Sequence, residues 1–161
     1  ADSPLKSLED LKGQRVTFPA PNAFAASLLI RAELAKKKVD ITPVFVKTHS
    51  NVYRSVIGKD ALAGGGVNNT LDNEAPEVRQ QLRVLYETPA YTPHPIATHP
   101  SVPSAVRERF SKAMFKLMQD DEGRKLLDGI NLNKPQPVSY VKHYKPLEAL
   151  QLDKFLVLTG P

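Results

Sequence analysis

Short apolar runs of strand length alternate with helical stretches along the first half of the chain, and this alternation constrains the fold most. Residues 15–18 predict a strand that Pro19 ends, because proline cannot continue a strand in the middle of a sheet. Residues 23–38 predict a helix, rich in alanine and leucine, with apolar side chains recurring at helical spacing. The order then repeats, with a strand at residues 44–46 and a short helix that Gly58 closes.

The same alternation continues over the next thirty or so residues. Residues 61–67 predict a third strand that ends in a glycine run, residues 77–81 a helix, and residues 82–86 a fourth strand. Strands that alternate with helices favour βαβ units, in which the strands are parallel and helices cover the sheet. The predicted fold class is therefore α/β, with a mostly parallel sheet of four or five strands flanked by helices.

The composition changes at residues 89–103, where five prolines crowd a segment that we interpret as a crossing. Pro103 is placed to open a helix, and a second helix is predicted to begin at the acidic residues 120–122, whose charge suits a helix N-terminus. We therefore divide the chain into an α/β ligand-binding lobe, residues 1–93, and a return segment, residues 94–161, whose C-terminal helices pack on the lobe or on a partner.

The helix after Pro103 has one apolar face, made by Val106, Phe110, Ala113, Met114 and Leu117. Leaving such a face in water is unfavourable, since each buried side chain of this kind contributes about 1.5–3 kcal/mol. We predict that the face packs onto the chain's own sheet, or that two copies pair by exchanging the segment after Pro89.

Composition excludes several classes of chemistry. The 161 residues contain no cysteine, so disulfides, thiolate metal sites and cysteine nucleophiles are absent. The net charge of +5 favours anionic partners, but the basic residues are scattered apart from residues 36–38, which argues against nucleic acid. His94 and His99 have no acidic partner at a metal-binding spacing, and no nucleophile elbow is present. We expect no metal, no cofactor and no enzymatic activity.

The candidate site follows from the predicted sheet, because ligands of open parallel sheets bind beyond the carboxyl ends of the strands. Three loops qualify, at residues 19–25, 48–50 and 66–70, and two of them lead into helix N-termini, where free N–H groups attract anions. The predicted ligand-binding residues in these loops are Asn22, Ala23, Phe24, Ala25, Thr48, His49, Ser50, Asn68 and Asn69.

Each of these residues also has a purely structural interpretation. His49 is the best single candidate to donate to an oxyanion, but it could equally bond a neighbouring carbonyl group at a helix start. Asn22 and Ser50 could cap their own helices. The glycine run at residues 64–66 lacks the Lys-Ser/Thr of a nucleotide phosphate loop, so close packing against a helix or ligand explains it better.

The order of these motifs resembles the second lobe of the periplasmic solute-binding proteins of phosphate/phosphite/phosphonate ABC transporters. Residues 6–16 are similar to the family's SLxDLKGKxV motif, residues 18–22 to its F-x-D-P-N turn, and residues 48–50 to its G-S-H turn. Residues 64–68 resemble A-G-A-V-D, and residues 86–103 resemble the crossing and C-terminal helix.

The resemblance implies one lobe of a type II periplasmic-binding-protein-like fold, a periplasmic or extracytoplasmic location, and partners in a small-molecule solute and the membrane subunits of a transporter. In this family Ser-Thr-Ser follows the proline-asparagine turn, whereas residues 23–25 here are Ala-Phe-Ala, and Asn68 stands where an aspartate is usual. Fewer hydroxyl donors make a small oxyanion costlier to bury. A larger or less charged solute than phosphate therefore fits better.

Two other functions use related lobes. One is the sensory input domain of a membrane histidine kinase, which would require a membrane-spanning segment beyond Pro161. The other is the effector-binding domain of a transcription regulator, which would require a helix-turn-helix upstream of Ala1. The sequence before Ala1 would distinguish these alternatives from a transport protein, for which a signal peptide and a first lobe are expected.

Overall fold

The computed structural model describes residues 3–130, 132 and 134–158. Residues 1 and 161, the outer bounds of the two predicted domains, lie outside the described residues. The chain forms two compact units, one made by Ala1–Ala90 with Pro146–Pro161 and one by Tyr91–Lys145. The functional division predicted after residue 93 stays a prediction, and the two units are described separately.

The first unit contains a parallel three-stranded sheet in the order β2-β1-β3. Its strands are β1 (Arg15–Phe18), β2 (Thr42–Phe45) and β3 (Ala63–Gly64). The predicted class, an α/β fold with a parallel sheet flanked by helices, is confirmed. The strands expected at residues 15–18, 44–46 and 61–67 are present, although the third is reduced to two residues.

Strand β1 is the buried centre of the sheet. Its residues Val16, Thr17 and Phe18 are each at most 2% exposed, as expected for a strand with a neighbour on both sides and a helix on both faces. Burial of Thr17 leaves its hydroxyl in need of an acceptor, and it donates to the carbonyl oxygen of Ala63 at 3.3 Å.

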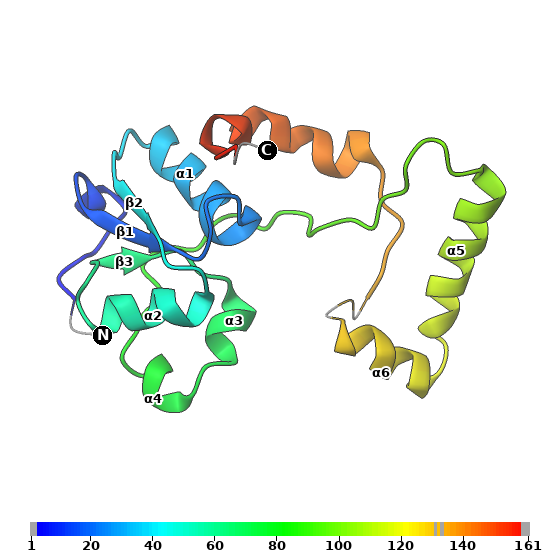
Figure 1. Cartoon of the computed structure of the whole chain (residues 1–161), viewed down its shortest axis with the longest axis horizontal. Helices are drawn as coiled ribbons and strands as arrows, with labels where there is room; N and C mark the ends of the chain where they lie inside the picture. Colours follow the sequence, from blue (N-terminus) through cyan, green and yellow to red (C-terminus); the bar gives the residue numbers. More distant parts are fainter. Residues whose placement is uncertain (1–2, 131, 133, 159–161) are drawn as a thin grey trace. The chain divides into compact units, whose positions relative to one another are not determined.

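Two helical segments cover opposite faces of this sheet (Figure 1). A π-helical segment, η2 (Phe24–Leu29), runs into α1 (Ile30–Lys36) between β1 and β2, and α2 (His49–Ile57) connects β2 to β3. Strand order β2-β1-β3 makes the two connections run in opposite directions, and right-handed crossings then require opposite faces. The single helix predicted at residues 23–38 is therefore present as two successive helical segments.

The core of this unit lies between the α1 face of the sheet and the N-terminal lead-in, which contains the short helix η1 (Glu9–Leu11). A cluster of buried apolar side chains joins them: Leu5, Leu8, Leu11, Val16, Phe18, Leu34 and Val39. The motif at residues 6–16 therefore supplies a covering segment as well as the central strand.

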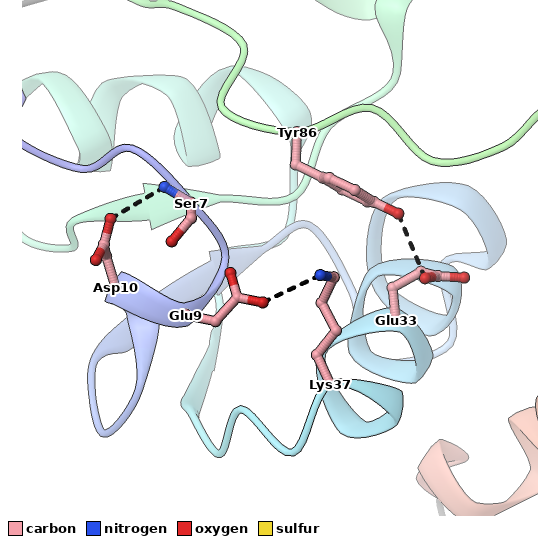
Figure 2. A network of polar contacts seen from close by, with 6 residues as sticks. All are labelled: Ser7, Glu9, Asp10, Glu33, Lys37 and Tyr86. Carbon is pink, nitrogen blue, oxygen red and sulfur yellow. Dashed lines mark hydrogen bonds and ion pairs between the residues drawn. The ribbon is translucent and has the colours of Figure 1, made fainter.

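A small polar network fastens this lead-in to α1 (Figure 2). Lys37 donates to the Glu9 carboxylate at 3.0 Å, and this pairing lowers the pKa of Glu9 and raises the pKa of Lys37. The Tyr86 hydroxyl donates to the buried Glu33 carboxylate at 3.3 Å. Burial, together with the Glu33 charge, raises the pKa of Tyr86. These contacts join three segments that are distant in sequence.

The fourth strand predicted at residues 82–86 is wrong, because these residues form no ladder with the sheet. The burial pattern gives the reason. Arg83 and Val84 are both exposed and the next two residues are both half-buried, so the alternation a strand needs is broken. Side chains hold the segment instead, through the Tyr86 hydroxyl and through Arg83, which donates to the carbonyl oxygen of Leu5. Among the described residues the sheet therefore has three strands, fewer than predicted.

Two short helices, α3 (Asn68–Asp72) and α4 (Pro76–Arg79), follow β3, and α4 confirms the helix predicted near residues 77–81. The chain returns to this unit after residue 145 through two 3-10 segments. They are η4 (Lys145–Leu150), which begins at the boundary, and η5 (Leu152–Phe155).

The second unit is built on α5 (Ser104–Leu117) and α6 (Asp121–Gly129), followed by the π-helical segment η3 (Tyr140–Tyr144). Both predicted helices are confirmed, and Asp120 caps α6 by accepting from the Gly123 N–H at 2.7 Å.

The apolar face of α5 remains partly open. Val106 and Phe110 are 50% and 46% exposed. Whether this face packs on the chain's own sheet or on a second copy stays a prediction.

Candidate functional site

All three predicted loops lie at one edge of the sheet. Because the strands are parallel, the turns that follow β1, β2 and β3 leave the sheet on the same side, at the carboxyl ends of the strands. Each turn leads directly into a helix that begins at Phe24, His49 or Asn68 respectively. The right-hand end of the sheet in Figure 1 therefore gathers three helix starts around the end of the central strand.

The start of α2 is the best-defined part of this edge. Thr48 has an extended backbone, and its hydroxyl accepts from the Asn51 N–H at 3.1 Å, which makes it the N-cap. The Asn51 side chain donates to the Val46 carbonyl oxygen at 2.8 Å and fixes the preceding turn. The first N–H groups of an α-helix have no acceptor within the helix, so this end carries a partial positive charge.

The ring nitrogen Nδ1 of His49, the first residue of α2, has an unusual environment. The His49 side chain is half-buried, and its Nδ1 atom is inaccessible to solvent and lacks a hydrogen-bond partner among the described residues. A bond from Nδ1 to a neighbouring carbonyl group, the structural interpretation, is therefore not formed within that part of the chain. A buried polar atom without a partner is costly, so Nδ1 can gain from a ligand that donates or accepts a hydrogen bond.

Two carboxylates that the sequence did not single out bond to predicted site residues. The Ser50 hydroxyl donates to Glu74, which follows α3, and the Asn68 amide donates to Glu87 at 2.6 Å. Each contact spans about twenty residues and depends on how the chain returns after β3, so no local motif indicates it. A carboxylate close to the carboxyl ends of the strands repels a doubly charged anion more strongly than a singly charged one.

The third loop is tied to α2 through hydroxyl groups. The Tyr53 and Thr70 hydroxyls lie 2.6 Å apart, and Thr70 also donates to the Val67 carbonyl oxygen at 2.7 Å. Asn69 is exposed at the start of α3, and its carbonyl oxygen accepts from Asn73 at the end of that helix. These bonds place α3 beside α2 and leave the Asn69 side chain facing solvent.

The loop after β1 is held by its own neighbours. The Asn22 side chain exchanges two hydrogen bonds with the backbone of Val157. Ala23 is the residue before η2, and its carbonyl oxygen accepts from the N–H groups of Ser27 and Leu28. Ala23, Phe24 and Ala25 are all half-buried, so this turn offers backbone and apolar groups where the family offers hydroxyls.

An apolar crevice of about 190 Å³ opens beside the third loop. Residues 64–68 line one side, and the α2 side chains Val52, Tyr53 and Val56 line another. Residues 81–86 and the leucines of the lead-in close the remainder. Its mostly apolar lining suits hydrocarbon and suits an anion poorly. The predicted close packing of the glycine run is confirmed at its inner end, where a β-carbon on Gly64 or Gly65 would collide with α2 or with η2 and Phe18.

No group of three or more His, Asp or Glu side chains within residues 3–130, 132 and 134–158 lies close enough to hold a metal ion. Over the same ranges, no helix is both long and apolar enough to cross a bilayer.

Comparison with known proteins agrees with the motif order. A family model described as "ABC transporter, phosphonate, periplasmic substrate-binding protein" matches residues 1–144. No curated protein matches the chain. Since the match covers most of the 161 residues and includes all three loops of the candidate site, the chain belongs to the family of periplasmic substrate-binding proteins of phosphonate ABC transporters.

Proposed function

We propose that this chain is the solute-binding module of an ABC import system and holds its solute at the carboxyl edge of the sheet. The observation that carries the proposal is the buried Nδ1 of His49 at the start of α2, which has no hydrogen-bond partner among the residues that the structure describes. It lies at the end of the sheet where three helices begin. Family membership supplies the extracytoplasmic location and the membrane subunits as partners. The family is non-catalytic in general, and we propose binding without turnover.

We further propose that the solute is larger or less charged than phosphate. Ala23, Phe24 and Ala25 provide no hydroxyl donors, and the carboxylates of Glu74 and Glu87 reach the other two loops. Both features disfavour a compact dianion. A phosphonate monoester carries one negative charge at neutral pH and an organic group on each side of phosphorus, and this chemistry meets both constraints.

Titration calorimetry with a phosphonate monoester and with inorganic phosphate tests the proposal. We expect the monoester to bind more tightly than phosphate. His49→Ala removes the imidazole ring at the start of α2 and should weaken binding by about ten- to a hundredfold, the value of a hydrogen bond to a charged group.

His99→Ala is the matched control, because His99 is exposed and its Nδ1 pairs with the Ser101 hydroxyl at 2.8 Å. This variant should bind like the unchanged protein. Tighter binding of phosphate would overturn the ligand proposal. Equal affinity of the His49→Ala variant would overturn the assigned role of this histidine.

The family match leaves the oligomeric state open, and for this we propose self-association through α5. The half-exposed Val106 and Phe110 side chains support it, since two copies that pair through this face bury apolar surface that the second unit does not cover by itself.

A further inference from the structure

The segment after residue 151 lies on the first loop of the candidate site. It consists of η5 (Leu152–Phe155), the extended residue Leu156 and Val157, and we call residues 152–157 the C-terminal strap. It belongs to the same compact unit as the sheet. Gln151, with a left-handed backbone at φ 50°, turns the chain into it.

The first attachment of the strap is made by Arg31 in α1. Its guanidinium lies over the ring of Phe155 at 5.3 Å and over the ring of Phe45, at the end of β2, at 5.8 Å. The same guanidinium donates to the Pro21 carbonyl oxygen at 3.1 Å, inside the turn that follows β1. Arg31 therefore joins the strap to the end of β2 and to the turn between β1 and η2.

The second attachment uses the whole amide group of Asn22. Its Nδ2 donates to the Val157 carbonyl oxygen at 3.0 Å, and its Oδ1 accepts from the Val157 N–H at 2.9 Å. This reciprocal pair occupies the edge of the amide on which one N–H and one oxygen lone pair lie side by side, and the remaining N–H and lone pair point in different directions. The strap is thus hydrogen-bonded to Asn22, the one predicted site residue of this loop whose side chain can form hydrogen bonds.

We propose that the C-terminal strap is a built-in competitor for the solute site. It closes on the turn after β1, and a solute that takes the edge of the Asn22 amide held by Val157 must displace Val157 first. The inference rests on the proposed function, because it concerns access to the same site. If the strap is closed most of the time, the apparent affinity for solute falls by the fraction of molecules in which it is open.

Two substitutions loosen the strap without changing a predicted site residue. Phe155→Ala removes the ring over Arg31. Val157→Pro removes the N–H that donates to Asn22, and Leu156 already has the extended backbone that a following proline requires. Leu158→Ala is the matched control, because this neighbouring side chain is 87% exposed.

Hydrogen exchange over residues 20–31 and calorimetry with a phosphonate monoester, both on the whole chain, test the proposal together. In the Phe155→Ala and Val157→Pro variants we expect faster exchange and roughly tenfold tighter solute binding. The Leu158→Ala variant should match the unchanged protein in both measurements.

The two possible failures are distinguishable. Faster exchange with unchanged or weaker solute binding would make the strap a structural clamp and overturn the competition while the proposed function stands. Unchanged exchange in both variants would show that these contacts do not hold the strap, which also overturns it. If neither the unchanged protein nor any variant binds solute, the proposed function fails and the competition fails with it.

Discussion

At the scale of single residues, the predictions that hold are those determined by neighbours in the sequence. The cap of α2 is Thr48, two residues before the suggested cap Ser50, whose hydroxyl donates to Glu74 instead. Gly65 sits where a side chain has no room, as its place in the glycine run indicates. Glu74 and Glu87 were missed because their contacts with Ser50 and Asn68 depend on long-range packing. Sequence therefore identified candidate site residues from the loops in which they lie. It could not identify Glu74 and Glu87, because their contacts with these loops form only when the later part of the chain folds back.

Gly65 gives the sharpest test at this scale. A β-carbon there would overlap the Ala26 carbonyl oxygen and lie 2.7 Å from Phe18 Cδ1, against rigid backbone and a fully buried ring. Gly65→Ala should therefore lower the free energy of unfolding by about 1–3 kcal/mol, as overpacking does.

Urea denaturation followed by circular dichroism measures this effect. Gly129→Ala, at the end of α6, is the control, since a β-carbon there meets nothing within 4 Å. Equal stability of the Gly65→Ala variant and the unchanged protein would contradict the packing described for the end of β3.

At the scale of elements, periodicity and capping predicted the helices better than the strands. Helix α5 begins directly after Pro103 and α6 directly after its cap Asp120, because proline and aspartate favour these positions locally. A strand depends on a partner elsewhere in the chain. The run at residues 82–86 had strand-like composition, but contacts of Arg83 and Tyr86 place it against the lead-in and α1 without a ladder.

The cap of α2 can be tested separately from solute binding. Thr48→Ala removes the hydroxyl that accepts from the Asn51 N–H, and it should lower the free energy of unfolding by about 1 kcal/mol without solute present. Thr48→Ser keeps an N-cap hydroxyl and should retain most of the stability. Urea midpoints that fall equally in both variants would argue that the threonine methyl group, and not the cap, stabilises this helix.

At the scale of the whole molecule, sequence predicted the α/β class and the family. It could not predict how few residues of the second unit are buried. Of the described residues in that unit, Gly123 and Leu127 are buried, and α5 keeps an apolar face open. Such a unit obtains little stability from its own core, which is consistent with a role in contacting another surface.

Self-association through α5 can be measured by light scattering over a range of protein concentrations. We expect a monomer–dimer equilibrium in the unchanged protein and a monomer in the Phe110→Glu variant, because a charge on this face would be buried in the dimer. Ser111→Glu introduces the same charge beside it, at an exposed polar position, and should leave the equilibrium unchanged. A monomer at every concentration would rule out the pairing.

We propose that solute binds where the three parallel strands end. Mapping amide chemical-shift changes by NMR while a phosphonate monoester is added tests it most directly. We expect the largest changes at residues 22–25, 48–50 and 68–69, and little change in residues 104–129. Changes centred on α5 and α6, or no saturable change at any residue, would contradict it.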